Sequence, residues 1–170
     1  MNDSPKPGSD RPLLFLDVDG VISLYGFSIE DRPPGQFHLV DGIAHCIGER
    51  CGERLGRLLD RFEVVWATGW EQKANEYLPA LLGRPELDLP VLGFDARAVF
   101  GSAHWKVEAI NRYAGERPAA WIDDSLDERC RRWASERSAP TLLIATEPAT
   151  GIGDEHVEEL LEWADRVALT

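Results

Sequence analysis

The sequence predicts an α/β fold with a mostly parallel sheet between two layers of helices. Short apolar runs, typical of strands buried on both faces, alternate along the chain with segments whose apolar residues recur at helical spacing. The apolar runs cover residues 12–18, 63–68, 89–92, 119–123 and 141–145. Strands that alternate with helices form βαβ units, and right-handed crossovers place their helices on both faces of one sheet.

Each strand prediction rests on the residues of its run. Residues 12–18 read PLLFLDV, 63–68 read EVVWAT, 119–123 read AAWID and 141–145 read TLLIA. The run at 89–92, LPVL, is the weakest of the five because Pro90 cannot donate a hydrogen bond to a neighbouring strand.

Helices are predicted between and after these runs. Leu55, Leu58 and Phe62 fall on one face of a helix over residues 49–62. The same spacing predicts helices over residues 103–114 and 154–169. Ser125 and Glu128 have the spacing of a capping box, which predicts a helix over residues 125–137.

Residues 21–48 break the alternation. Two pieces of alternating apolar residues flank Arg32-Pro33-Pro34-Gly35, which predicts a β-hairpin flap inserted after the first strand, with Pro33-Pro34-Gly35 at or near its turn. Residues 1–11 are polar and rich in proline, as expected of a flexible tail. Residues 12–170 then form one domain that includes the flap.

Composition and charge exclude several classes of protein. The chain has 170 residues with 18 Lys and Arg against 30 Asp and Glu, a net charge of −12. This acidity argues against bulk binding to nucleic acid or to an anionic membrane, but it allows a small phosphorylated substrate. No apolar stretch approaches the ~20 residues of a membrane span. Three cysteines without C-x-x-C spacing, and no secretory signal, favour free thiols and a cytoplasmic location.

Acidic residues follow two of the predicted strands. Asp17 and Asp19 end the first run, and Asp123 and Asp124 end the run at 119–123. The carboxyl ends of parallel strands meet at one edge of a sheet, which is where such folds bind ligands. Carboxylates gathered there repel one another unless a cation compensates them, and Mg²⁺ prefers such oxygen ligands. The sequence therefore predicts a magnesium site.

Two further features suit a phosphate beside that metal. Thr68 and Gly69 end the second run, and the spacing of Thr68 and Glu71 predicts a helix whose free N–H groups can bind an anion. Lys106, near the start of the helix before residues 119–123, can reach the same edge. Lys73 is the alternative, and we favour Lys106 on geometry.

Four short segments of the chain resemble, in their order, the four motifs of the haloacid dehalogenase (HAD) superfamily of hydrolases. They are Asp17-Val18-Asp19-Gly20-Val21, Thr68-Gly69, Lys106 and Asp123-Asp124. The resemblance spans residues 13–151. It implies a three-layer Rossmann-like fold with a five-stranded sheet in the order 5-4-1-2-3. The short flap is similar to that of small-cap or capless phosphatases in this superfamily.

The resemblance also implies a role for each motif residue. Asp17 would be the nucleophile that forms an aspartyl-phosphate, and Asp19 the general acid and then the base. Thr68, Gly69 and Lys106 would bind the phosphate. Mg²⁺ would be held by Asp17, by the backbone carbonyl of Asp19 and by the pair Asp123-Asp124. The resemblance does not decide whether Asp123 or Asp124 is the direct ligand. A second aspartate two residues after the nucleophile distinguishes phosphatases from dehalogenases in the superfamily.

The flap carries the candidates for substrate specificity. Tyr25, Phe27, Phe37 and His38 could contact the part of a substrate beyond its phosphate, and Trp70 could stack on a base or ring. Packing of these aromatic residues within the protein is the alternative. An open site suits a nucleotide, a nucleic-acid end or a phosphoprotein as the substrate.

Two non-catalytic interpretations stay open at this point. A phosphoacceptor domain like a bacterial receiver also uses an acidic cluster, a threonine and a lysine, but its acidic pair precedes one central aspartate. A regulatory module could use the same carboxylates to hold a structural cation. The order of motifs favours a phosphomonoester hydrolase over both.

Overall fold

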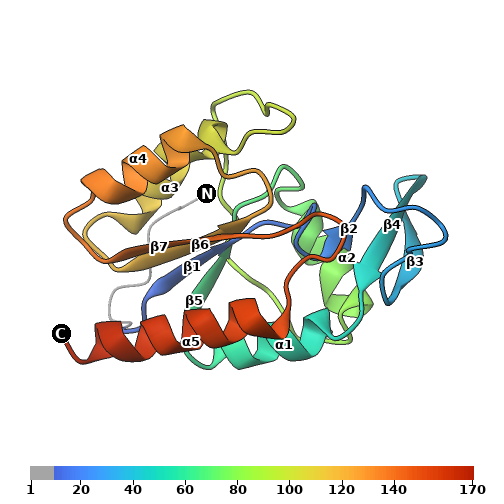
Figure 1. Ribbon diagram of the computed structural model, residues 1–170, viewed down its shortest axis with the longest axis horizontal. Coiled ribbons are helices and arrows are strands. Elements are labelled where there is room, and N and C mark those ends of the chain that lie inside the picture. The colour runs from blue at the N-terminus through green and yellow to red at the C-terminus, as the bar shows by residue number, and fades with distance from the viewer. Residues whose placement is uncertain (1–9) are drawn as a thin grey trace.

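The central sheet is parallel, and its strands come from segments far apart in the sequence. The computed structural model describes residues 10–170, and it pairs β1 (Leu13–Leu16) with β5 (Glu63–Trp66) on one side and with β6 (Ala119–Asp123) on the other. β7 (Thr141–Ala145) pairs with β6, so that the strand order is β5-β1-β6-β7. The predicted α/β fold is confirmed (Figure 1).

Helices cover both faces of this sheet. α1 (Cys51–Leu59) and α5 (Asp154–Ala168) lie on one face, and α3 (Val107–Ala114) and α4 (Glu128–Glu136) lie on the other (Figure 1). Successive residues of β1 point to opposite faces, so Leu14 and Leu16 pack with the first pair of helices. Leu13 and Phe15 pack with the second pair. Burial on both faces explains why β1 is apolar at every position.

The expected fifth strand is wrong. Residues 89–92 contribute a single parallel bridge, between Trp66 of β5 and Val91, and the sheet has four strands. Trp66 donates its backbone N–H to the Pro90 carbonyl, and Leu92 donates its N–H to the Trp66 carbonyl. Pro90 has no N–H to extend the ladder, so the segment lies at the β5 edge without forming a strand.

The flap has a different turn from the one predicted. β2 (Ser23–Leu24), β3 (Gly35–Val40) and β4 (Ile43–Gly48) form a separate antiparallel sheet in the order β2-β4-β3. Val40 pairs with Ile43, so the hairpin turn is Asp41-Gly42, where φ is 52° and 80°. Positive φ at both residues is typical of a type I′ turn, which Asp-Gly favours. Pro33 and Pro34 precede β3.

The flap tip is attached to the body through α2 (Lys73–Leu81). Asp41 accepts a hydrogen bond from the Tyr77 hydroxyl at 2.9 Å and forms an ion pair with Lys73. These contacts lower the pKa of Asp41. Lys73 therefore holds the flap and lies outside the acidic cluster, as our preference for Lys106 requires.

The predicted helices are present, but two of the predicted helix starts are wrong. Asp127, not Ser125, caps α4: its carboxylate accepts from the backbone N–H groups of Arg129 and Cys130. The helix expected directly after Thr68 begins at Lys73. The helix expected over residues 103–114 starts with a short 3₁₀ turn, η1 (His104–Lys106), before α3.

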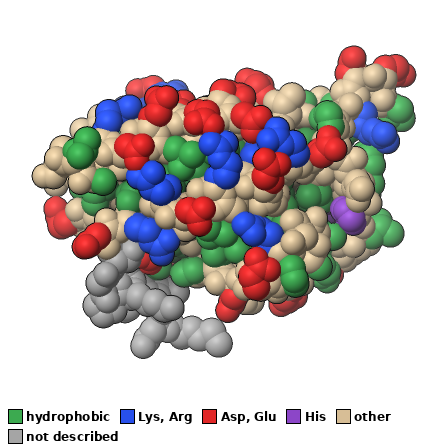
Figure 2. Space-filling view, turned by 90° about the horizontal axis from the view of Figure 1, so that it is seen from below, with side chains coloured by type: hydrophobic (Ala, Val, Ile, Leu, Met, Phe, Trp, Pro, Cys, Tyr) green, Lys and Arg blue, Asp and Glu red, His purple; other side chains and the backbone are tan. Residues whose placement is uncertain are grey.

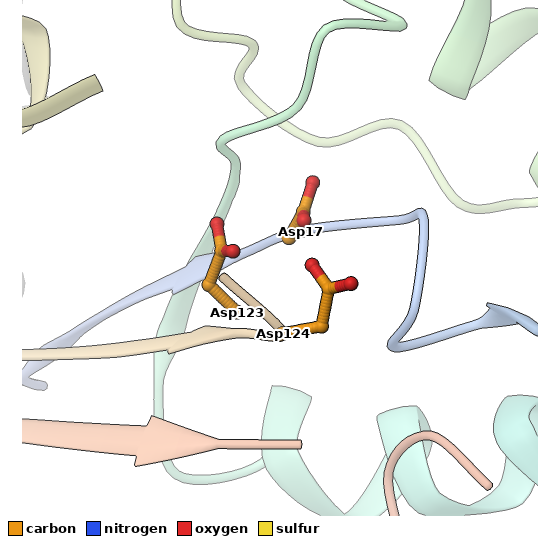
Figure 3. A group of neighbouring side chains, drawn as sticks. All are labelled: Asp17, Asp123 and Asp124. Atoms are coloured by element: carbon orange, nitrogen blue, oxygen red, sulfur yellow. The ribbon is translucent and has the colours of Figure 1, made fainter. Parts of the chain in front are cut away.

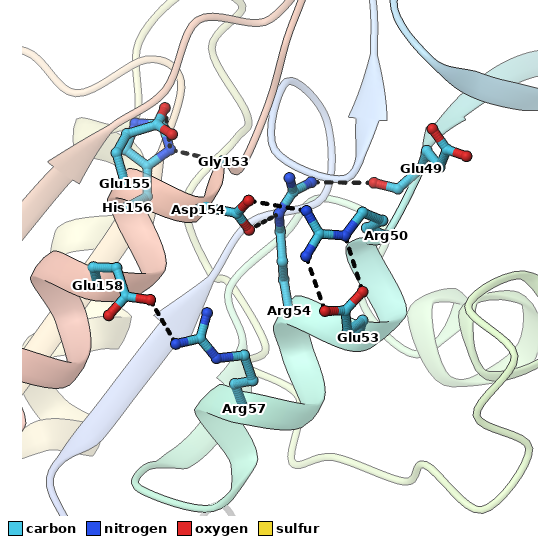
Figure 4. A network of polar contacts seen from close by, with 10 residues as sticks. All are labelled: Glu49, Arg50, Glu53, Arg54, Arg57, Gly153, Asp154, Glu155, His156 and Glu158. Atoms are coloured by element: carbon cyan, nitrogen blue, oxygen red, sulfur yellow. Dashed lines mark hydrogen bonds and ion pairs between the residues drawn. The ribbon is translucent and has the colours of Figure 1, made fainter.

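Ion pairs link α1 to α5 on the surface. Asp154 pairs with Arg50 at 2.9 Å and with Arg54 at 3.0 Å, and Arg57 pairs with Glu158 at 2.6 Å (Figure 4). Most of these groups are exposed, so each pair contributes little to stability. On this face acidic and basic side chains are interspersed, and no large basic area gathers (Figure 2).

Two other expectations concern the chain ends and membranes. Of the tail predicted over residues 1–11, residues 1–9 lie outside the part of the chain that the structure describes. None of the described helices has the length and apolar character that crossing a membrane requires.

Candidate active site

Three carboxylates meet where β1 and β6 end. Asp17 follows β1, Asp123 is the last residue of β6, and Asp124 comes next. Their side chains point toward one another (Figure 3), and one oxygen of each lies within 4.8 Å of the others. Parallel pairing of β1 with β6 places these residues together, as predicted from the strand ends.

Lys106 lies between two of these carboxylates. Its Nζ is 3.0 Å from Asp17 Oδ1 and 2.7 Å from Asp123 Oδ2, and the residue is only 3% exposed. Burial by itself would lower the pKa of Lys106, but the two carboxylates hold this pKa above its usual range. Burial also raises the pKa of Asp17 well above its usual value, and the attraction of Lys106 offsets part of that rise.

Asp123 and Asp124 differ in their surroundings. Asp123 is buried, and both its oxygens are engaged, by Lys106 and by the backbone N–H of Ser125 at 2.9 Å. Asp124 accepts from the Ser125 hydroxyl at 3.1 Å and from the hydroxyl of Tyr25 in the flap. Burial and the Asp124 carboxylate raise the pKa of Tyr25, so its hydroxyl stays protonated and donates.

Gly20 in the first motif is required by this packing. Its φ is 76°, and a Cβ at this position would lie 2.3 Å from Asp124 Oδ2. A larger residue would displace the Asp124 carboxylate. The glycine thus lets the chain after Asp17 and Asp19 pass close to the second acidic pair.

Asp19 belongs to the same cavity but not to the carboxylate cluster. Its Oδ2 accepts a hydrogen bond from Trp70 Nε1 at 3.0 Å. Burial of the carboxylate raises the pKa of Asp19, and the Trp70 hydrogen bond opposes that shift. The expected metal ligand at Asp19 is its backbone carbonyl, and that role stays a prediction.

The residues predicted to bind phosphate, Thr68 and Gly69, follow β5, the strand next to β1. Gly69 lines the cavity, whereas Thr68 is fully buried and its hydroxyl accepts from the backbone N–H of Trp70 at 3.2 Å. The structure therefore places both residues at the same edge of the sheet as Asp17.

Asp17, Asp19, Gly69 and Lys106 border a cavity of about 480 Å³ together with Asp123 and Asp124. The cavity wall also includes residues 98–103, Trp105 and Ser125, none of which the sequence marks as a site residue. The loop has no apolar periodicity, so no signal marked it. Trp105 packs edge-on against Phe94, with ring centroids 4.7 Å apart, and its ring lies beside Lys106.

The predicted specificity residues separate into two groups. Tyr25 lines the cavity, and Trp70 lies beside the cavity and donates a hydrogen bond to Asp19. Phe27 packs on Phe37, with ring centroids 6.4 Å apart. His38 borders a different cavity, of about 650 Å³, between the flap and α1. Phe27 and His38 are therefore not in the lining of the cavity that holds the acidic cluster.

The carboxylate cluster fits a divalent cation. Asp17 and Asp123 are buried, and Lys106 supplies one positive charge against three facing carboxylates. The excess negative charge is costly away from water unless a cation compensates it. Oxygen donors alone suit a hard ion such as Mg²⁺.

A family profile for HAD domains in Swiss Army Knife RNA repair proteins matches residues 13–157. The chain belongs to this family. Its structure is similar to that of the HAD domain of effector protein Lem4 from Legionella pneumophila, with a TM-score of 0.56 and 17% identity over 94% of this chain and 98% of that one. At this identity the likeness concerns the fold. The search of curated proteins found no match.

The first prediction concerns Lys106. Lys106→Met leaves the buried Asp17 and Asp123 carboxylates without a counter-charge, and should lower the free energy of unfolding by about 3–5 kcal/mol in metal-free buffer. Urea unfolding with EDTA measures this loss.

Lys73→Met is the matched control. It removes the exposed ion pair with Asp41 and should cost no more than about 1 kcal/mol. Equal losses in the two variants would contradict the structural role assigned to Lys106.

Proposed function

We propose that this protein is a Mg²⁺-dependent phosphatase that hydrolyses phosphomonoesters through an aspartyl-phosphate on Asp17, with a nucleotide or a nucleic-acid end as the substrate. The observation that carries the proposal is the cluster of Asp17, Asp123, Asp124 and Lys106 at an open cavity in a HAD domain. Free, buried cysteines in the described structure support a cytoplasmic location.

In the first step Asp17 attacks phosphorus. One carboxylate oxygen forms the new O–P bond while the O–P bond to the leaving alcohol breaks. Asp19 donates its proton to the leaving oxygen, so the alcohol departs neutral. The raised pKa of Asp19 favours this role, because a larger fraction of the side chain is protonated near neutral pH. The hydrogen bond from Trp70 holds Asp19 beside the cavity.

In the second step water attacks the phosphorus of the aspartyl-phosphate. Asp19, now a carboxylate, takes a proton from that water, and the bond between phosphorus and the Asp17 oxygen breaks. Inorganic phosphate leaves, and both aspartates return to their starting state. Lys106, the Thr68 hydroxyl and the Gly69 amide neutralise and position the phosphoryl oxygens throughout.

Asp17 and Asp124 would hold the metal directly, with Asp123 in support. Asp123 has both oxygens engaged by Lys106 and Ser125, whereas Asp124 contacts two hydroxyl groups that can rearrange. When bound, Mg²⁺ would supply charge that offsets the repulsion between Asp17 and the incoming phosphate.

The activity itself is tested by phosphate release from p-nitrophenyl phosphate. We expect hydrolysis with Mg²⁺, loss of activity in EDTA and recovery when Mg²⁺ is added back. Full activity after exhaustive chelation would remove the metal from the proposal. Metal binding without turnover of any phosphomonoester would instead favour a regulatory, non-catalytic module.

Asp17→Asn should lower phosphate release by about a thousandfold or more, because a neutral amide is a poor nucleophile. Circular dichroism checks that the variant is folded. The exposed Asp60→Asn is the matched control, since it removes the same charge far from the cluster and should keep full activity. Turnover at the normal rate in Asp17→Asn would rule out the covalent intermediate.

Asp19→Asn should distinguish substrates by their leaving groups. Alkyl phosphates need a proton on the departing oxygen, so their kcat/KM should fall by about 100-fold or more. Because nitrophenolate leaves without protonation, p-nitrophenyl phosphate should lose less in a single-turnover measurement of the first step. The same loss for both esters would show that Asp19 is not the general acid.

A further inference from the structure

The wall of the active-site cavity includes a tight turn with an exposed aromatic ring at its tip. Val99 and Ser102 form an antiparallel bridge, and Ser102 donates its N–H to the Val99 carbonyl at 3.4 Å. Phe100 and Gly101 are the central residues. Gly101 has a φ of 75°, as the third position of a type II turn requires.

Phe100 is presented to solvent rather than to the core. It is 94% exposed and Val99 is 46% exposed, and both border the cavity that holds Asp17 and Lys106. Single exposed apolar residues are ordinary on protein surfaces and need no function. This pair differs because it adjoins the proposed reaction site and because hydrogen bonds hold the backbone of its turn.

The fixed position comes from contacts at the end of the turn. The Ser102 hydroxyl donates to Asp127, the residue that caps α4, and lies 2.6 Å from His104 Nδ1. The Ala103 N–H donates to the Ser125 carbonyl at 2.9 Å. Ser125 follows Asp124 directly, so the turn is hydrogen-bonded to the segment that carries the acidic pair.

The charge of the cavity limits what can bind beside the ring. Lys106 is the basic residue of the lining, against Asp17, Asp19, Asp123 and Asp124. With Mg²⁺, this set can accept one phosphate, but it offers no cation to a second one, and the chain has a net charge of −12. The volume of about 480 Å³ suits a small molecule.

We propose that Phe100, supported by Val99, is the platform on which the base of a single nucleotide stacks while its phosphate lies at Asp17. The inference rests on the proposed phosphatase activity and narrows its substrate to a nucleoside monophosphate that is recognised through one phosphate and one base. Stacking suits every base, because each has a planar π-face, and it needs no further charge.

The test compares substrates that differ by the base. Adenosine 5′- and 3′-monophosphate are assayed against ribose 5-phosphate with the wild-type protein and Mg²⁺. We expect kcat/KM for at least one nucleotide to exceed that for ribose 5-phosphate by about tenfold. Phe100→Ala should bring kcat/KM for the nucleotide down to that for ribose 5-phosphate, and Phe100→Trp should retain the difference between the two substrates.

Ile29→Ala is the matched control. Ile29 is 90% exposed in the flap but does not line the cavity, so its truncation should change kcat/KM for neither substrate. A 5′- or 3′-phosphorylated pentanucleotide should have no higher kcat/KM than the matching mononucleotide. A large preference for the pentanucleotide, or for a phosphotyrosine peptide over both nucleotides, would overturn the assignment.

A binding measurement separates this inference from the activity. In Asp17→Asn, at least one adenosine monophosphate should bind about tenfold more tightly than ribose 5-phosphate, and adding Phe100→Ala should abolish the difference. Hydrolysis of ribose 5-phosphate without any base preference would overturn the platform and leave the phosphatase standing. Base-dependent binding without turnover would support the platform and overturn the proposed phosphatase activity.

Discussion

The contact on which the site depends is the buried triad of Asp17, Lys106 and Asp123. A buried carboxylate without a counter-charge is strongly destabilising, so each of these side chains fixes the others. The triad also joins three separate parts of the chain: the end of β1, the end of β6 and the 3₁₀ turn before α3. Asp123 is held by Lys106 and the Ser125 backbone, and Asp17 and Asp124 border the cavity beside it. The same contact therefore positions the proposed nucleophile and defines which carboxylates remain for a cation.

Two of the contacts between the flap and the body bear on this arrangement. Tyr25 donates to Asp124, and Asp41 at the tip binds Lys73 and Tyr77 of α2. The first contact connects the flap to Asp124, a residue proposed to bind the metal. Metal binding at Asp124 and the position of Tyr25 would therefore be linked. The second holds the tip through exposed groups, each of which contributes little. A flap fastened in this way borders the cavity without enclosing it, which leaves much of the contact with a substrate to other walls.

The sequence predicted the gathering of the three carboxylates better than the turns and helix starts around them, and for a physical reason. Parallel pairing places strand ends at one edge, so Asp17, Asp123 and Asp124 could be brought together from their positions alone. Local turn chemistry was harder to predict. Asp41-Gly42 is a stronger hairpin signal than Pro33-Pro34-Gly35, and it forms the turn. Asp127, not Ser125, caps α4. Residues 98–103 could not be predicted, because their position depends on Ser102 and Ala103 contacting residues more than twenty positions away.

The electrostatics of the cavity and its apolar wall are complementary. Four carboxylates around one lysine repel any anion that a metal does not neutralise, so attraction by charge can serve one phosphate and no more. Discrimination between phosphate esters must then come from contacts that carry no charge. Val99 and Phe100 supply such contacts at the same cavity, on a turn hydrogen-bonded to the segment next to Asp124. A site that accepts a single phosphate would have to recognise the rest of its substrate by shape and stacking, which is the role that we propose for Phe100.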